Sequence, residues 1–343
     1  MAENKEFDAI MKEITAGLTG NPEKDMKYLM ETSEAYKEHQ YGKEILRACG
    51  RMMYDLIPDD KKEELENAFN NDITGFHQSL EEARSNIQNK DYDKALDILG
   101  NMVSKYEEGN LFANDEVSEY FCFDEPMQEI LYRHQNNPEK DLRRAGIDFM
   151  ALYYLYGGVL VELGCVKEAR AALEKAKRWN PASATVAFEY GETFKMEGDL
   201  DNFLKATREI YPYIYRKADF ARFYRNLGYY YIEKEDYLTA ACCFLYSGSY
   251  EQHPMIASEL IYIEQKTGKK LSPTMEELMI YFEENDIPLT ISEEMLKIAY
   301  SYGKHFYDEG DMDTTAYFWG IFVEFIQDTE VEKVLAEIAK KKE

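Results

Sequence analysis

Apolar residues recur every three or four positions along most of the chain, which is the spacing of one face of an α-helix. Between Glu3 and Thr19, for example, Phe7, Ile10 and Ile14 follow this spacing. Short breaks rich in glycine, proline, asparagine and aspartate, such as Gly20-Asn21-Pro22, separate the helical stretches. No stretch shows the period of two that a half-buried strand requires. The pattern therefore predicts an all-α chain of about seventeen helices.

Two stretches differ from this regular pattern. Lys61–Gln88 has an unbroken helical spacing and predicts one long helix. Glu107–Glu125 combines acidic clusters with a glycine and is the weakest region for regular structure. We expect this second stretch to be a connector, with Tyr120–Phe123 exposed in it.

The helical stretches also repeat at a spacing of about 34 residues. Three features recur in register: a glycine in the first helix, a turn residue seven positions later, and a mostly small residue five positions after that. The three sets are Gly157, Gly164 and Ala169; Gly191, Gly198 and Phe203; and Gly228, Glu235 and Ala240. A residue without a side chain lets the first helix of each pair lie close to the second. The repeat therefore predicts pairs of antiparallel helices.

This skeleton resembles the tetratricopeptide repeat, a helix-turn-helix unit of 34 residues. The best copy has Tyr153, Tyr156, Gly157, Leu160, Gly164, Ala169, Leu173, Ala176 and Pro181 at family positions, and a distant copy has Tyr302, Gly303, Phe306, Gly310, Asp311 and Trp319. The resemblance implies an all-α, right-handed α-solenoid of stacked helix pairs.

The repeats suggest how the chain is divided. Residues 1–110 are expected to form a degenerate tetratricopeptide-like unit, and residues 111–125 the connector. Residues 126–268 are expected to form a central unit with repeats near 150–181, 184–215 and 221–252. Residues 269–343 would then hold one more repeat and an end helix.

A coarser repeat covers two segments near Asn21-Pro-Glu-Lys-Asp25 and Asn137-Pro-Glu-Lys-Asp141. Residues 7–25 and 123–141 share ten of 19 positions at a constant offset of 116. One interpretation is a tandem duplication retained for packing. The other is that both loops contact the same kind of partner.

Composition narrows the class of partner. The chain has 66 acidic and 40 basic residues and a net charge of −26, which disfavours binding to nucleic acid or to an anionic membrane surface. No apolar run has the length of a signal peptide core or of a membrane span. The five cysteines have no metal-ligand spacing, so buried, reduced thiols and a cytoplasmic location are expected.

No motif for catalysis, cofactor binding or metal binding stands out. The five histidines are dispersed, and Gly157-Gly158 lies in a helical pattern without the features of a phosphate-binding loop. Asp308–Asp313 has the acidic residues of a calcium loop but lacks its glycine and its final glutamate, so Asp311 is expected to cap the next helix. The chain is therefore predicted not to be an enzyme and to use no cofactor and no metal.

The resemblance also implies a concave face lined by the first helix of each pair. Seven predicted partner-binding residues follow from the family's inward-facing positions: Tyr154, Phe188, Glu192, Lys195, Arg222, Arg225 and Tyr229. Lys195, Arg222 and Arg225 would form a basic island suited to an acidic segment or a C-terminal carboxylate. Alternatively, these cations pair with Glu189, Glu192 and Glu233. The carboxylate clamp of the chaperone-binding family members is not reproduced, because Tyr154, Gly158 and Glu189 occupy its first three positions.

The predicted function is that of a scaffold that holds a protein or peptide partner on this concave face, with no catalysis. One alternative is a tetratricopeptide-type chaperone for secreted or assembling client proteins. Another is a peptide-sensing regulator, although such proteins usually carry a basic DNA-binding segment and none is present here. The sequence makes no prediction of the oligomeric state.

Overall fold

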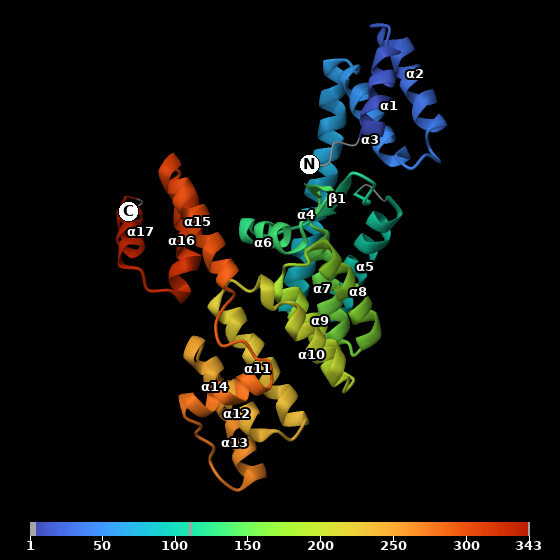
Figure 1. Ribbon diagram of the computed structural model, residues 1–343. Coiled ribbons are helices and arrows are strands. Elements are labelled where there is room, and N and C mark those ends of the chain that lie inside the picture. Colours follow the sequence, from blue (N-terminus) through green and yellow to red (C-terminus); the bar gives the residue numbers. More distant parts are fainter. Residues whose placement is uncertain (1–4, 110–111, 342–343) are drawn as a thin grey trace. The chain divides into compact units, whose positions relative to one another are not determined.

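The computed structural model describes residues 5–109 and 112–341, which form two compact units (Figure 1). Unit 1 comprises the chain up to Cys122 together with Asn137–Gly164. Unit 2 comprises Phe123–Asn136 and the chain from Cys165 onwards. The described residues contain seventeen α-helices, so the predicted helical repeat fold is confirmed. The four segments predicted from the repeats divide the chain differently and stay a prediction.

Unit 1 begins with three helices around a small core. They are α1 (Lys5–Ala16), α2 (Pro22–Ala35) and α3 (Gly42–Asp55). Ile14, Leu29, Ile45 and Cys49 are buried between them, one or two from each helix. The predicted break at Gly20-Asn21-Pro22 is present, since the side chain of Asn21 caps α2 by accepting a hydrogen bond from the Lys24 N–H.

Two longer helices and one from later in the chain complete the helical part of unit 1. They are α4 (Asp59–Gln88), α5 (Tyr92–Gly109) and α7 (Phe149–Glu162). The single long helix predicted for this region is thus confirmed as α4. Phe76 of α4 packs edge-to-face on Tyr106 of α5 at 5.3 Å between ring centroids, and Tyr106 packs on Phe149 of α7 at 6.3 Å. These contacts place α5 between α4 and α7.

The all-α fold class is confirmed, but the expected connector contains one short strand that the sequence pattern did not indicate. β1 (Ser118–Phe121) pairs in parallel with β2 (Asp141–Arg144), with Ser118 opposite Asp141. Tyr120, Phe121 and Cys122 are buried and not exposed as expected. Each strand has four residues. They are too short to show alternation, and their pairing depends on a partner segment that is distant in the sequence.

The two duplicated segments adopt different structures. In the first copy, Asp25 lies in α2 and accepts hydrogen bonds from the backbone and hydroxyl of Thr19 and from the Gly20 N–H. Gln135 and Asn136 replace Thr19 and Gly20 in the second copy, so the hydroxyl is lost. Asp141 there begins β2, and Lys140 donates a hydrogen bond to the Asp115 carbonyl at 2.6 Å. The two loops therefore present different surfaces, which counts against a shared partner.

The remaining described helices form unit 2. In chain order they are α6 (Pro126–Asn136), α8 (Val166–Trp179), α9 (Ala184–Met196), α10 (Leu200–Glu209), the 3₁₀ turn η1 (Tyr211–Tyr213), α11 (Lys217–Glu233), α12 (Tyr237–Tyr250), α13 (Pro254–Thr267), α14 (Met275–Glu284), α15 (Glu293–Glu309), α16 (Met312–Phe325) and α17 (Thr329–Lys340). Most of these helices pack on their neighbours in sequence, while α6 packs on η1 and α14 on α12. Packing is extensive within α9–α10, α11–α12 and α15–α16, the three helix pairs in this unit that the repeat pattern predicts.

Glycines mark the crossing point within each of these pairs. A Cβ added to Gly228 of α11 would lie 2.8 Å from the ring of Phe244 on α12, and one on Gly303 of α15 would lie 2.5 Å from Nε1 of Trp319 on α16. Both distances are too short for a real Cβ contact. The close approach that the sequence predicts from these glycines is therefore present.

The turns inside the pairs also share one geometry. Gly198, Glu235 and Gly310 have φ angles of 74°, 60° and 83°, in the left-handed region. The aspartate that follows each of them caps the second helix; Asp311, for instance, accepts a hydrogen bond from the Thr314 N–H. The interpretation of Asp311 as a helix cap is thus confirmed.

Four of the five cysteines are buried, as expected, but Cys165 is exposed. It directly precedes α8, at the turn of the best repeat. No helix in the described part of the chain is long and apolar enough to cross a membrane.

Candidate functional site

The strongest candidate surface lies on α9, α11 and α13 of unit 2. We call it the α9–α11 face and define it by Glu189, Glu192, Lys195, Arg222, Tyr229, Glu233 and Glu259. Arg222 reaches from α11 to α9, where it forms an ion pair with Glu189 at 2.9 Å and approaches Glu192 at 4.0 Å. Lys195 pairs with Glu192 at 3.2 Å and lies over the ring of Tyr229, 4.2 Å from its centroid. These contacts connect the two first helices of adjacent pairs.

The structure brings five of the seven predicted site residues together on or beneath this face. Glu192, Lys195, Arg222 and Tyr229 belong to the face itself. Phe188 lies beneath it, 1% exposed, with the Arg222 guanidinium 5.0 Å above its ring. Phe188 is therefore a packing residue that supports Arg222.

The remaining two predicted residues lie elsewhere. Tyr154 is on α7, in unit 1. Arg225 is 8% exposed and reaches α12, where it pairs with Glu251 at 2.8 Å and lies 3.4 Å from Oγ of Ser247. Arg225 thus holds α11 on α12 and is not a surface cation.

Carboxylates outnumber cations on the α9–α11 face. Four glutamates, at 189, 192, 233 and 259, surround the two cations Lys195 and Arg222. Burial raises the pKa of Glu259, and the negative charge of Glu233 adds to the rise, while Lys195 opposes it. Glu233 and Glu259 form no ion pair within 4.0 Å in the described part of the chain. The repeat pattern did not predict Glu259 as a site residue, because the sequence of α13 does not match any copy of the repeat.

One further carboxyl group beside this face, that of Asp219, has a shifted pKa. Asp219, near the start of α11, has its pKa raised by burial, with Arg216 and Arg222 acting in the opposite direction.

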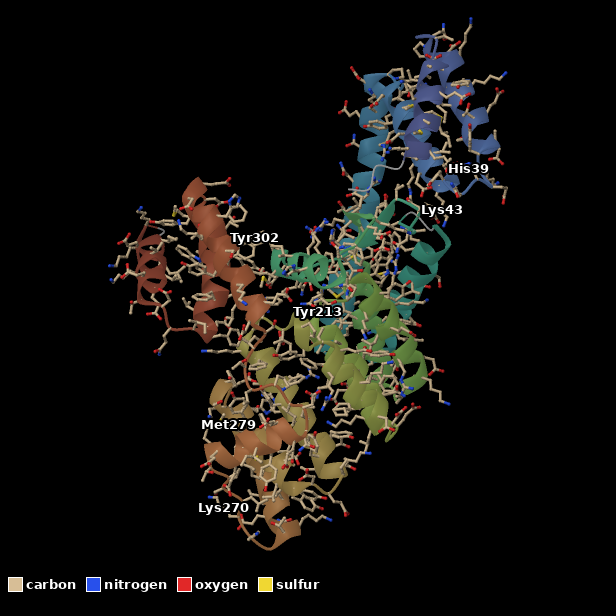
Figure 2. The ribbon with its side chains drawn as sticks, viewed as in Figure 1. His39, Lys43, Tyr213, Lys270, Met279 and Tyr302 are labelled. Carbon is tan, nitrogen blue, oxygen red and sulfur yellow. The ribbon has the colours of Figure 1, made fainter. Side chains whose placement is uncertain are left out.

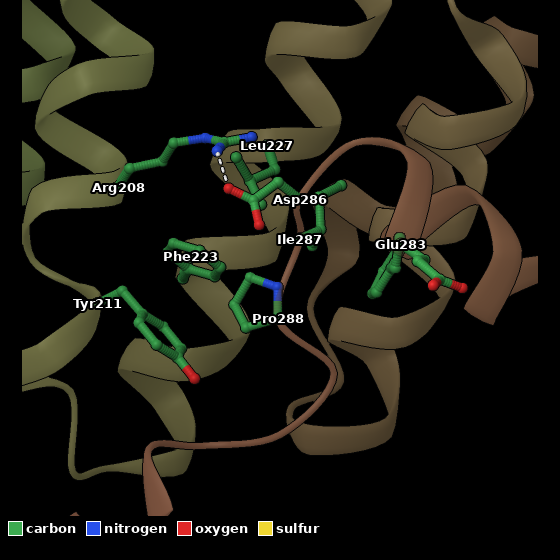
Figure 3. Close-up of a pocket in the computed structure, with 9 residues that line it drawn as sticks. Arg208, Tyr211, Phe223, Leu227, Glu283, Asp286, Ile287 and Pro288 are labelled. Atoms are coloured by element: carbon green, nitrogen blue, oxygen red, sulfur yellow. Dashed lines mark hydrogen bonds and ion pairs between the residues drawn. The ribbon is translucent and has the colours of Figure 1, made fainter.

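A pocket of about 420 Å³ lies on another side of α11 (Figure 3). Its walls are Arg208 of α10, Tyr211 of η1, Phe223 and Leu227 of α11, and residues of α14 and the loop after it. In Figure 3 the Arg208 guanidinium points toward Asp286 of that loop, from which it is 3.4 Å distant, and it also donates to the Asn285 carbonyl at 2.8 Å.

Tyrosine hydroxyls fasten the same loop. Tyr224 donates to the Pro288 carbonyl at 2.5 Å, Tyr211 donates to the Thr290 carbonyl at 2.7 Å, and Tyr246 donates to the Leu289 carbonyl. Burial raises the pKa of Tyr224 and of Tyr211. Part of the tyrosine excess of this chain therefore serves to dock the loop on α10, α11 and α12. The pocket is the space left beside this docked loop.

The structure offers no metal centre among the residues it describes. No group of three or more histidine, cysteine, aspartate or glutamate side chains in the described ranges could hold a metal ion.

Comparison with known proteins finds weak similarity to solved structures. No protein-family model and no curated protein matches the chain. Among solved structures, a tetratricopeptide repeat protein from Parabacteroides merdae is 12% identical, with 92% of this chain and 98% of that one covered and a TM-score of 0.39. PilF of Pseudomonas aeruginosa is 18% identical, with coverages of 57% and 84% and a TM-score of 0.32. The tetratricopeptide domain of P58(IPK) is 13% identical, with coverages of 97% and 85% and a TM-score of 0.32.

The helix pairs of this chain are themselves tetratricopeptide-like, because each of α9–α10, α11–α12 and α15–α16 has a glycine facing the second helix, a left-handed turn residue and an aspartate cap.

Proposed function

We propose that this tetratricopeptide-like protein is a non-catalytic interaction scaffold that holds a positively charged segment of a partner protein on the α9–α11 face. The charge balance of that face is the observation that carries the proposal. Arg222 and Lys195 already have carboxylate partners, whereas Glu233 and Glu259 have no ion-pair partner in the described part of the chain. A lysine or arginine of a bound segment would supply the missing positive charge.

This proposal differs from capture of an acidic segment, which a basic island would favour. Arg225 is turned toward α12, and each of the two remaining cations is within 4.0 Å of a carboxylate. An acidic segment would have to displace those carboxylates and would then face four glutamates. The arrangement therefore supports the alternative that the cations pair within the chain.

Partial burial of the α9–α11 face strengthens the ion pairs that a basic segment would form with it. Glu192 and Arg222 have side chains that are each 29% exposed. Ion pairs between fully exposed groups are worth about 0–1 kcal/mol, and partial burial reduces the screening of charges by water and salt. Because these charges are still partly exposed, the affinity for a segment with several basic residues should fall as the salt concentration rises.

The test is affinity capture of partners with the wild type and two charge-reversal variants. The double variant Glu233→Lys/Glu259→Lys changes the face by four charges and removes no ion pair of the described part of the chain. The matched control is Glu332→Lys/Glu337→Lys on α17, where both side chains are exposed. A partner retained by the wild type and the control, and lost by the face variant, supports the proposal. Equal retention by all three proteins would refute it, provided that circular dichroism shows equal folding.

A second candidate is a chaperone for aggregation-prone client proteins. The observation that favours it is the apolar surface of α14, where Met275, Met279 and Ile280 are 61%, 49% and 49% exposed. Figure 2 labels Met279 on this helix. Exposed methionines are typical of surfaces that adapt to several partners. Co-expression with an insoluble client should raise the client's soluble fraction, and Met275→Ser/Met279→Ser should remove this effect.

A further inference from the structure

Unit 1 contains a pocket of about 590 Å³ that the proposed scaffold function does not use. Its volume is in the range of about 300–1,000 Å³ that is common for small-molecule sites. One side of α3 forms most of the wall, and two aromatic rings complete it, Phe112 from the segment before β1 and Tyr120 from β1 itself. The lining residues are Arg47, Gly50, Arg51, Tyr54, Asp55, Phe112 and Tyr120. The α3 residues are three or four positions apart, so they lie along one face of the helix.

Gly50 forms an open part of this wall. A Cβ at this position would meet no atom within 4 Å, in contrast to the glycines at helix crossings. Glycine inside a helix costs about 1 kcal/mol relative to alanine, and no packing contact in the described structure requires it here. Its effect is to leave space against the backbone of α3 in the pocket wall.

The two arginines of the pocket have different roles. Arg47 forms an ion pair with the buried carboxylate of Asp115, donates to the Ala113 carbonyl and lies 5.0 Å from the centroid of the Tyr120 ring. Its charge is therefore satisfied, and it helps to hold Tyr120 in place. Arg51 is exposed one turn further along and has no ion pair or hydrogen bond to any residue that the structure describes. Arg51 is thus the cation available to a ligand.

Aromatic rings supply the rest of the binding chemistry. Phe112 and Tyr120 lie 5.6 Å apart between ring centroids, and Tyr54 comes from α3. Such rings favour a flat apolar group. Asp55, four residues after Arg51, adds a hydrogen-bond acceptor on the same side of the helix.

We propose that this pocket binds an aromatic α-amino carboxylate. Arg51 would bind the carboxylate with two parallel hydrogen bonds, Asp55 would accept a hydrogen bond from the adjacent nitrogen, and the three rings would surround the aromatic side chain. Of the two arginines that line the pocket, Arg51 alone has no ion-pair partner among the described residues, so the pocket offers one cation to one carboxylate. The net charge of −26 disfavours polyanions such as nucleotides. The ligand is either a free aromatic amino acid or the C-terminal residue of a peptide, because both carry an N–H beside the carboxylate.

Calorimetric titration of the full chain with defined probes tests the proposal. L-phenylalanine, L-phenylalaninamide and 3-phenylpropionate separate the contributions of carboxylate and nitrogen. Binding of L-phenylalanine at least tenfold tighter than the amide supports the site. A peptide ending in phenylalanine, compared with its C-terminal amide, identifies the source of the ligand. Failure of L-phenylalanine and of the free-carboxylate peptide to bind the wild type would overturn the proposal.

Two variants locate the binding. Arg51→Gln should weaken binding of the best probe at least tenfold, and Gly50→Leu should abolish it by filling the pocket. Gly75→Leu on α4 is the matched control, because a Cβ there also meets no atom within 4 Å and Gly75 does not line the pocket. Unchanged affinity in Arg51→Gln or in Gly50→Leu, with the fold intact by circular dichroism, would contradict the proposal. Because the pocket lies in unit 1, this result is independent of the test of the α9–α11 face.

Discussion

Three glycines at the same position of three helix pairs, α9–α10, α11–α12 and α15–α16, make a direct test of how these helices pack. Gly191, Gly228 and Gly303 each face the second helix of their own pair, yet the space around them differs. We predict that the same substitution by alanine changes the stability of unit 2 in opposite directions at these three positions. Gly191→Ala should stabilise unit 2, whereas Gly228→Ala and Gly303→Ala should destabilise it.

The size of each effect follows from two opposing contributions. Alanine in place of glycine inside a helix stabilises by about 0.5–1 kcal/mol. At Gly191 the nearest atom to the new Cβ is Cβ of Ala206 at 3.7 Å, an ordinary van der Waals contact, so this gain is retained. At Gly228 the new Cβ would lie 2.8 Å from the ring of the fully buried Phe244. Overpacking of this kind costs about 1–3 kcal/mol, which leaves a net loss of about 1–2 kcal/mol.

Gly303→Ala should be at least as damaging as Gly228→Ala. The new Cβ would lie 2.5 Å from Nε1 of Trp319, and the indole is held in place by a hydrogen bond from Nε1 to the Tyr300 carbonyl at 3.1 Å. Trp319 is 4% exposed, so it has little room to move.

Thermal unfolding followed by circular dichroism measures these differences. For a unit of this size, 1 kcal/mol corresponds to a change in Tm of about 2–4 °C. We therefore expect Gly191→Ala to raise Tm by a few degrees and the other two variants to lower it by about 2–8 °C. A loss of stability in Gly191→Ala equal to that in Gly228→Ala would refute the reasoning, since the predicted difference rests on the ring contacts alone.

Three further predictions concern the turn, the buried ion pair and the acidic face. Glu235→Gly should raise the free energy of unfolding by about 1 kcal/mol, because Glu235 has a φ angle of 60° that glycine adopts without strain; denaturant titration measures it. Arg225→Met should cost about 2 kcal/mol by leaving Ser247 and Glu251 without their partner, whereas Arg222→Met at the surface should cost less than about 1 kcal/mol; equal losses would contradict the assigned roles. Because the folded pKa of Glu259 is raised, this group takes up a proton before an unfolded glutamate does as the pH falls. Protonation of Glu259 therefore stabilises the folded state. This stabilisation is complete below the pKa of an unfolded glutamate, about 4.3, and is lost as the pH rises through the folded pKa. A captured basic segment should therefore bind more weakly at pH 5 than at pH 7, and Glu259→Gln should reduce this difference.

The sequence predicted those features that depend on local spacing. The glycine at position 228, the turn at Glu235 and the cap at Asp311 all occupy their predicted places, because each of them depends on residues within a few positions along the chain. The predicted site residues were partly brought together for the same reason, since Glu192, Lys195, Arg222 and Tyr229 follow the register of the repeat.

Other features depend on which distant segments meet, and the tertiary structure alone decided them. Two duplicated segments with the same Asn-Pro-Glu-Lys-Asp sequence enter a helix in one place and a strand in the other, because Asp25 has Thr19 to bond and Asp141 has a strand beside it. Likewise, spacing placed Arg225 on the first helix of its pair, but packing against Glu251 determined that it is buried. Periodicity fixes which side of a helix a residue occupies, while the charge and burial of that side are set by neighbours that the local sequence does not contain.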